Sequence, residues 1–150
     1  MSQAQSRFVY VSYIRATPEK LWVALTQAAF TKQYWFGASP VSTWQAGADW
    51  KLVLDSGRVA DTGAILEADP PRRLVIKWLC HMREDFTAEG YSRCTIELEP
   101  AGDGVKLTIS HENDRPNSPF INEGIADGWP KIISSLKSLM ETGEVLEIQQ

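Results

Sequence analysis

The sequence has few of the features that mark several large classes of protein. It contains two cysteines, Cys80 and Cys94, whose separation fits neither a CxxC metal site nor a CxxC redox motif. No apolar run approaches the ~20 residues that span a bilayer, and no basic flank followed by an apolar segment opens the chain. We therefore expect a cytoplasmic protein with no membrane partner, in which both cysteines are free thiols.

Neither sign of charge is in large excess. The chain has 15 lysine and arginine residues and 19 aspartate and glutamate residues, for a net charge of −4. No run of five like charges occurs, so we expect no nucleic-acid partner. Hydrophobic residues make up 43 % of the chain and charged residues 23 %, as is usual for a globular protein. We expect a single domain over residues 1–150, which is long enough to bury roughly 70 % of its unfolded surface.

The motifs of the common catalytic machineries are missing from the sequence. There is no glycine-rich phosphate loop, no HExxH pair and no GxSxG nucleophile turn. The two histidines, His81 and His111, are too few for a metal site without further ligands. We therefore expect neither a metal nor a cofactor, and an enzyme is the less favoured class of function.

What the sequence does contain is a clear succession of elements. The alternating, β-branched and aromatic residues of 6–15 predict a first strand. Two short helices are predicted next, over 16–26 and 28–34. From Val41 onward, turn signals at hairpin spacing predict six further strands, and such short connections imply an antiparallel sheet. The charged turn HMREDFTAEGY (81–91) is expected to be an exposed hairpin tip.

The segment from Asn117 to Gly143 is the strongest helix of the chain. Ser118 can cap its start, Pro119 suits its first turn, and Gly143 suits the position past its end. Its apolar side chains recur at helical spacing and form one continuous stripe: Ile121, Ile125, Trp129, Ile132, Ile133, Leu136, Leu139 and Met140. A helix with so long a stripe needs a broad sheet to pack against.

Gly128 and Pro130 lie in the middle of this helix. Proline has no N–H to donate to the carbonyl of Ala126, at a cost of ~3 kcal/mol in a straight helix. Because the apolar stripe continues in phase on both sides, we predict a kink and no termination. Two interpretations stand: the helix bends around a curved sheet, or the distortion opens space beside Trp129 for a ligand.

Four segments of the sequence together resemble a known family. They are IRATPEKLWVALTQAAFTKQYWFG, GAILEADPPRRLVIKW, LTISHEN and EGIADGWPKIISSLKSLMETG. In their order along nearly the whole chain, they resemble the homologues of the activator of heat-shock protein 90 ATPase. This family belongs to the START-like superfamily, also called SRPBCC or helix-grip proteins.

The resemblance implies an α+β fold of the helix-grip type. A curved antiparallel sheet of about seven strands wraps around the long C-terminal helix, and two short helices after the first strand close one end. The space between sheet and helix is commonly a ligand cavity in this superfamily. Its members include hydrophobic-ligand carriers, polyketide cyclase and aromatase relatives, and a domain of a co-chaperone. The additional N-terminal domain of that co-chaperone has no counterpart in these 150 residues.

Six tryptophans in 150 residues are either pocket-lining or core residues, because indole offers a large apolar area and one N–H donor. Trp22 is assigned to packing of the first helix. If the cavity exists, the candidate ligand-binding residues are Trp35, Phe36, Trp50, Trp78, Cys80, His111, Phe120, Trp129 and Ile133.

His111 and Asp61 are the weak catalytic candidates. His111 is in phase with the inward side chains of its predicted strand, so it either serves a ligand as a proton shuttle or is a buried, hydrogen-bonded core residue. Asp61 shares a strand face with Glu67; it is a buried carboxylate with a raised pKa if that face is concave. The solvated alternative is favoured for Asp61, with Arg58 and Arg73 as pairing partners, and His81 is expected to face solvent.

The leading hypothesis is a domain that binds a small apolar or aromatic molecule between its sheet and its C-terminal helix. One alternative is a polyketide cyclase-like, aromatase-like or hydrolase-like enzyme that uses His111. Another is a co-chaperone-like interaction module with a chaperone as partner. The sequence leaves the identity of the ligand and the oligomeric state open.

Overall fold

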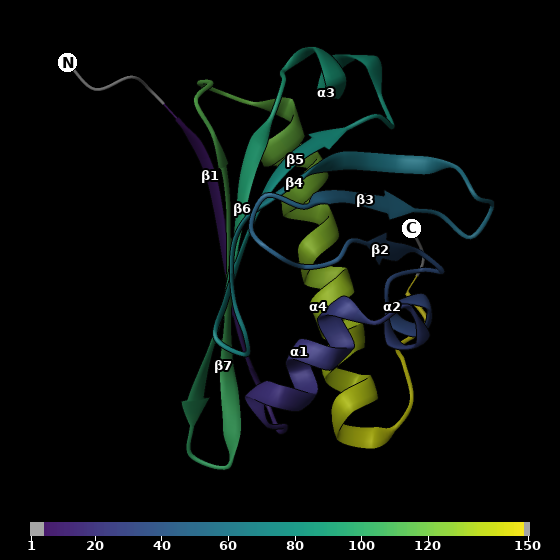
Figure 1. Ribbon diagram of the computed structural model, residues 1–150, viewed down its shortest axis with the longest axis vertical. Coiled ribbons are helices and arrows are strands. Elements are labelled where there is room, and N and C mark those ends of the chain that lie inside the picture. The colour runs from purple at the N-terminus through teal and green to yellow at the C-terminus, as the bar shows by residue number, and fades with distance from the viewer. Residues whose placement is uncertain (1–4, 149–150) are drawn as a thin grey trace.

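The computed structural model describes residues 5–148 and shows an α+β domain (Figure 1). Its strands are β1 (Ser6–Ile14), β2 (Ser39–Val41), β3 (Asp49–Val53), β4 (Val59–Asp69), β5 (Arg73–Cys80), β6 (Ser92–Ala101) and β7 (Gly104–Asn113). Its helices are α1 (Pro18–Thr26), α2 (Ala28–Tyr34), α3 (Glu84–Ala88), the π-helix η1 (Phe120–Ile125) and α4 (Ala126–Thr142). Over the described residues, no helix is long and apolar enough to cross a membrane.

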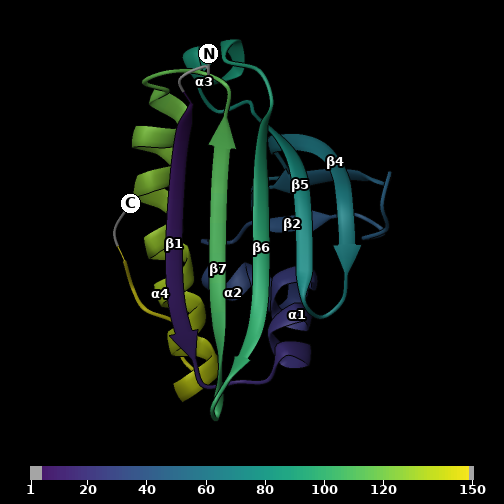
Figure 2. The ribbon, with the colours of Figure 1, turned by 90° about the vertical axis from the view of Figure 1, so that its left-hand side faces the viewer.

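The seven strands form one sheet in the order β1-β7-β6-β5-β4-β3-β2. Every neighbouring pair is antiparallel, as the short connections predicted. Figure 2 shows the long strands β1, β7 and β6 side by side, with α4 behind them. The seven-stranded helix-grip architecture expected from the sequence is therefore confirmed.

The long C-terminal helix lies in the hollow of the sheet (Figure 1). The Ser118 hydroxyl caps its beginning by accepting a hydrogen bond from the Ile121 N–H at 3.1 Å. Gly143 adopts a left-handed conformation at its end, where its N–H donates to the Leu139 carbonyl at 2.9 Å. Its inward side chains are buried against the sheet: Ile121, Ile125, Trp129, Ile132, Ile133 and Leu136. Both predicted helix ends and the apolar stripe are confirmed.

Pro130 does not terminate this helix, because α4 continues through it to Thr142. The irregularity lies upstream, where Phe120–Ile125 forms a π-helix. A π-helix is wider than an α-helix and is frequently found at functional sites. The sequence indicated a distortion in this region, but its apolar spacing gave no sign of the π-helical form.

The segment between β5 and β6 joins an antiparallel strand pair and is mostly exposed, as the sequence predicted, but it is more than a simple turn. It contains the short helix α3, in which Phe86 is only 6 % exposed. The Phe86 ring packs edge-on against Phe120, with 5.4 Å between ring centroids. The five-residue helix was missed because a single apolar residue among charged ones carries no periodic signal.

Strand β1, at one edge of the sheet, is tied down at both ends. At its start, the Ser6 hydroxyl donates to the Arg115 carbonyl and accepts from the Ser118 N–H. Past its end, the Arg15 N–H donates to the Glu141 carboxylate at 2.8 Å. The opposite edge is β2, a strand of three residues with a proline at its centre.

Candidate functional site

A cluster of tryptophans fills the space between the sheet and α4. Trp50, Gly63 and Trp78 stand opposite one another on β3, β4 and β5. Because Gly63 has no side chain, the two indoles meet across it, with ring centroids 4.4 Å apart. A Cβ at Gly63 would lie 1.6 Å from the Lys77 carbonyl oxygen, so the close approach of β4 and β5 requires glycine here.

Trp35 and Trp129 complete this cluster. The Trp129 ring lies 5.4 Å from that of Trp35 and 5.9 Å from that of Trp78. The central void between these side chains measures about 10 Å³, roughly the space of a single water molecule. The interior of the sheet is therefore packed with indoles, and it holds no ready-made large cavity in the described part of the chain.

One polar atom in this cluster is left without a partner. Trp50 is 2 % exposed, and its Nε1–H has no hydrogen-bond acceptor among the described residues. A buried unsatisfied donor costs about 1–3 kcal/mol. The same side chain lines the 10 Å³ void, so a ligand or water with an acceptor oxygen there would relieve that cost.

A larger pocket of about 140 Å³ opens at the π-helical end of the cluster. Its lining combines indoles, aliphatic side chains, one carboxylate and two glycines: Trp35, Leu52, Asp61, Trp78, Gly124, Ile125, Gly128, Trp129 and Ile132. A cavity of about 150 Å³ is enough for one benzene ring. Three of its tryptophans also border the central void, so rotation of an indole would connect the two spaces.

Gly124 and Gly128 form the helical side of this pocket. A Cβ at Gly128 would meet open space, because beyond the adjoining residues and the backbone of its own helix no atom lies within 4 Å. At Gly124, by contrast, a Cβ would lie 3.0 Å from the Phe86 ring of α3. The opening is therefore at Gly128, while Phe86 covers the helix one turn earlier.

Asp61 is buried in this pocket, which corrects the solvated interpretation of the sequence. The side chain is 6 % exposed and accepts a hydrogen bond from the Trp78 Nε1–H at 2.6 Å. No arginine pairs with it among the interactions of the described residues. Burial raises the pKa of Asp61 to about 6, although the Trp78 and Cys80 hydrogen bonds oppose that rise.

A β-bulge separates Asp61 from Glu67, which the sequence predicted to share one strand face. The register of β4 against β5 shifts between Ile65 and Glu67, so one extra residue separates the two halves of the strand. Asp61 therefore points inward, whereas Glu67 is exposed and pairs with Arg73 on the outer face. The expected pairing of Asp61 with Arg73 does not form either, because Arg73 pairs with Glu67 and Glu97.

His111 is fully buried beside the cluster, and both of its ring nitrogens are engaged. Its Nδ1 accepts from the Trp129 Nε1–H at 3.2 Å, which places the ring proton on Nε2 because indole is only a donor. Nε2 then donates to the Ser92 hydroxyl at 2.8 Å, and that hydroxyl donates to the Trp78 carbonyl at 3.2 Å. Burial lowers the pKa of His111 to about 3. The histidine is therefore neutral, and its two hydrogen bonds join β7 to β6 and to α4.

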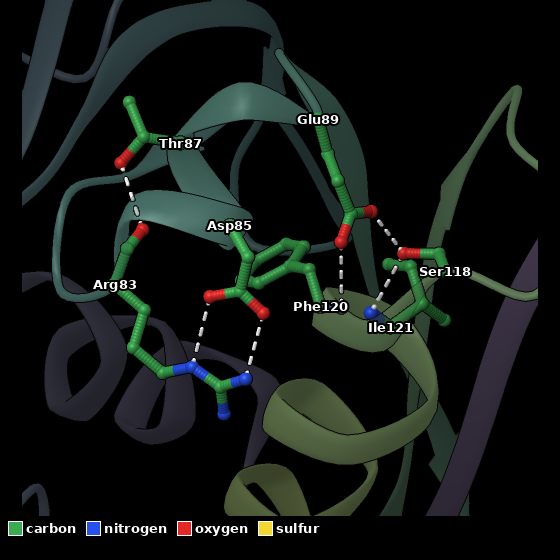
Figure 3. A network of polar contacts seen from close by, with 7 residues as sticks. All are labelled: Arg83, Asp85, Thr87, Glu89, Ser118, Phe120 and Ile121. Atoms are coloured by element: carbon green, nitrogen blue, oxygen red, sulfur yellow. Dashed lines mark hydrogen bonds and ion pairs between the residues drawn. The ribbon is translucent and has the colours of Figure 1, made fainter.

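A polar network holds α3 against the beginning of the C-terminal helix (Figure 3). One Glu89 carboxylate oxygen accepts from the Phe120 N–H at 2.9 Å. The other accepts from the Ser118 hydroxyl and from the Asn113 side-chain amide. On the far side of α3, Arg83 makes a two-point pair with Asp85. We call Glu89, Ser118 and the Phe120 N–H the α3 latch, because they fix the segment that covers Gly124.

The remaining predicted residues fall into different surroundings. Cys80 hydrogen-bonds to Asp61, and burial raises the pKa of its thiol to about 11. Phe120 packs edge-on against His111 at 5.5 Å, next to the tryptophans. Phe36 lies at the edge of the hydrophobic core, and Ile133 is fully buried in it. Neither side chain borders the 140 Å³ pocket. Both cysteines are free thiols.

Several residues that shape the site are not predictable from the sequence pattern. Leu52, Ile125 and Ile132 line the pocket through apolar patterns shared with the core. Glu89 was read as part of a charged turn, and only its contact with the helix start reveals its role. Among residues 5–148, no three histidine, cysteine, aspartate or glutamate side chains gather in a way that would hold a metal ion.

A larger hollow lies elsewhere on the surface, on the rim formed by β3 and β4. It measures about 720 Å³ and is wide open; among its lining residues are Ser42, Lys51, Thr62 and Tyr91. Nearby, His81 faces outward as expected and hydrogen-bonds to the Thr62 hydroxyl at 2.7 Å. The 140 Å³ pocket is the better candidate site, because it brings aromatic faces and a buried carboxylate together.

Comparison with family models identifies the chain. The model described as activator of Hsp90 ATPase homolog 1-like protein matches residues 15–141. The protein belongs to this family. The match spans all the elements described above except β1 and the last residue of α4. Comparison with curated proteins gives no match.

Solved structures of several other proteins have the same fold as this chain. A protein from Mesorhizobium loti, MLL2253, is 26 % identical, with 93 % of this chain and 99 % of that chain covered and a TM-score of 0.73. CalU16 from Micromonospora echinospora is 20 % identical over 95 % and 87 % of the two chains, with a TM-score of 0.71. An Hsp90 activator from Plasmodium falciparum is 22 % identical over 89 % and 93 %, with a TM-score of 0.69.

Proposed function

We propose that the protein binds a small apolar or aromatic molecule between its sheet and its C-terminal helix. The 140 Å³ pocket carries this proposal, because three indoles line a space of about one aromatic ring next to a π-helix. The missing side chain of Gly128 keeps that space open to entry. The unpartnered Trp50 N–H offers a further anchor if an indole rotates to admit more of the ligand.

Benzyl alcohol is a suitable probe, since it is one aromatic ring with a single hydroxyl. We expect it to change the tryptophan fluorescence in a saturable way and to raise the melting temperature by mass action. Gly128→Leu, which places a side chain in the open space beside the pocket, should abolish both effects. Asn122→Leu is the matched control, because Asn122 is exposed on η1 and does not line the pocket. An equal response in both variants would contradict the proposal.

The enzyme alternative needs His111 to exchange a proton with a substrate. In the structure, both ring nitrogens of His111 are hydrogen-bonded, and its pKa lies near 3. Catalysis by His111 therefore requires the tryptophan cluster to open first. If a turnover activity is found, His111→Gln should abolish it, and unchanged turnover would exclude the histidine as the base.

Membership of the Hsp90 activator family favours a second candidate function, which is binding to a chaperone. We place the contact at an apolar groove of about 370 Å³ lined by Val23, Phe30 and Met140, where Phe30 is 37 % exposed. Under this proposal, the protein stimulates the ATPase of an Hsp90 and Phe30→Asp removes the stimulation. An unchanged ATPase rate with the wild-type protein would reject it.

A further inference from the structure

The carboxylate of Asp61 is the only ionisable group among the residues that line the 140 Å³ pocket. One of its oxygens accepts from the Trp78 N–H, and the Cys80 thiol also hydrogen-bonds to it. An ionised carboxylate has about four acceptor positions. It therefore keeps capacity for a further donor that arrives from the pocket.

The surroundings of Asp61 suit a positive charge. The faces and edges of Trp35, Trp78 and Trp129 line the same space, and aromatic rings attract cations electrostatically. A buried carboxylate is poorly stabilised without a charged partner, which agrees with the raised pKa of Asp61.

The charged side chains next to the pocket glycines in sequence do not line the pocket. Glu123 and Asp127 precede the two pocket glycines along the helix and are exposed. The basic side chains of the flanking segments are already engaged, because Arg83 pairs with Asp85 and Lys131 with Asp127. A cationic ligand therefore meets the carboxylate of Asp61 on the wall of the pocket.

We propose that this pocket selects an aromatic ligand of one ring that carries a protonated amine, with Asp61 as the residue that pairs with the ammonium group. This inference rests on the proposed function, and it adds the chemical class of the ligand. The ring lies among the three indoles, and the ammonium donates to the free acceptor positions of Asp61.

The test compares benzylamine, which is protonated at neutral pH, with benzyl alcohol, which has the same ring and no charge. Binding is measured by calorimetry and by the NMR signals of the indole N–H protons. We expect benzylamine to bind the wild-type protein at least tenfold more tightly than benzyl alcohol and to shift the Trp78 Nε1–H signal. Asp61→Asn should abolish the preference for benzylamine over benzyl alcohol, because asparagine carries no charge but still offers an oxygen to Trp78 Nε1.

The outcomes separate this inference from the proposed function. If the wild-type protein binds both probes equally, the ammonium preference is wrong and the aromatic site survives. If neither probe binds, both proposals fail. Benzylamine binding that persists equally in Asp61→Asn would place the ammonium elsewhere and overturn the role of Asp61. The comparison of the two probes on the wild-type protein needs no variant, so it decides the matter even if Asp61→Asn does not fold.

Discussion

At the scale of single residues, Gly63 makes the tryptophan cluster possible. It lets Trp50 and Trp78 meet across β4 and lets the backbone of β5 come close. Glycine at such a position is required by contact and not by an unusual φ, because no positive φ is recorded for Gly63. The arrangement of the candidate site therefore depends on a residue that contributes no side chain to it.

We expect Gly63→Ala to lower the free energy of unfolding by about 3 kcal/mol or more, because its Cβ would overlap the Lys77 carbonyl. Gly128→Ala is the matched control. Its Cβ meets open space, and alanine gains up to about 1 kcal/mol in a helix. Urea unfolding of both variants checks the prediction, and a Gly63→Ala variant as stable as wild type would contradict it.

Two buried titratable residues act on stability in opposite directions. Burial raises the pKa of Asp61 from 3.8 to about 6, so its contribution is fully present below pH 3.8 and is lost as the pH rises to 6. Burial lowers the pKa of His111 from 6.5 to about 3, so its contribution is present above pH 6.5 and is lost as the pH falls toward 3. Between pH 4 and 6 the two effects offset each other.

Asp61→Asn removes one of these effects and should expose the other. We expect the free energy of unfolding of the variant to fall by on the order of 2 kcal/mol from pH 6 to pH 4 relative to wild type. Denaturant unfolding at several pH values gives this difference, in which the surface carboxylates cancel. Parallel stability curves for the two proteins would show that Asp61 titrates normally.

At the scale of elements, the α3 latch joins the β5–β6 connection to the π-helix. Glu89 satisfies the Phe120 N–H, a donor at the helix start that has no partner within the helix. Through this bond, a five-residue helix far from η1 in sequence is held so that its Phe86 ring covers Gly124, one of the two glycines of the pocket. Opening of α3 would therefore widen the way into the site.

Glu89→Ala should lower the free energy of unfolding by about 2 kcal/mol, because it removes the acceptor of the Phe120 N–H and one acceptor of the Ser118 hydroxyl. Hydrogen exchange should become faster over residues 120–125. Glu84→Ala is the control, since Glu84 is exposed in the first turn of α3 and makes no side-chain bond in the described structure. Equal exchange in both variants would mean that the latch is not holding the helix.

The sequence predicted the elements better than their irregularities. Alternation and turn residues located the strands, and the apolar stripe located α4 with its caps at Ser118 and Gly143. The bulge in β4 and the π-helical form of η1 were not predictable, because each changes the count by one residue without changing composition. The inward position of Asp61 was not predicted because Arg58 and Arg73 were expected to pair with it in solvent, whereas Arg73 pairs with Glu67 and Glu97. The inward position of His111 followed from the regular alternation of β7.

At the scale of the whole molecule, the two cysteines report on how tightly the domain is closed. Cys94 is completely buried and Cys80 is 7 % exposed, and burial raises the pKa of both thiols. Because the thiolate is the reactive form, a thiol reagent should label neither residue in the folded protein.

We therefore expect Ellman's reagent to detect two thiols after unfolding and none within minutes in the native state. The rate of labelling should follow the denaturant dependence of global unfolding. Rapid labelling of one thiol in the native protein would contradict this expectation and point to an open path along the pocket to Cys80.

The two edge strands of the sheet, β1 and β2, bear on how the protein behaves at high concentration. One border is anchored at both of its ends through Ser6 and Arg15, and the other is three residues long with Pro40 in the middle. Exposed strand borders are templates on which further chains can add. The short edge with Pro40 offers little such template, so any addition of chains in concentrated solution should begin at β1, where Val9, Val11 and Tyr13 are exposed.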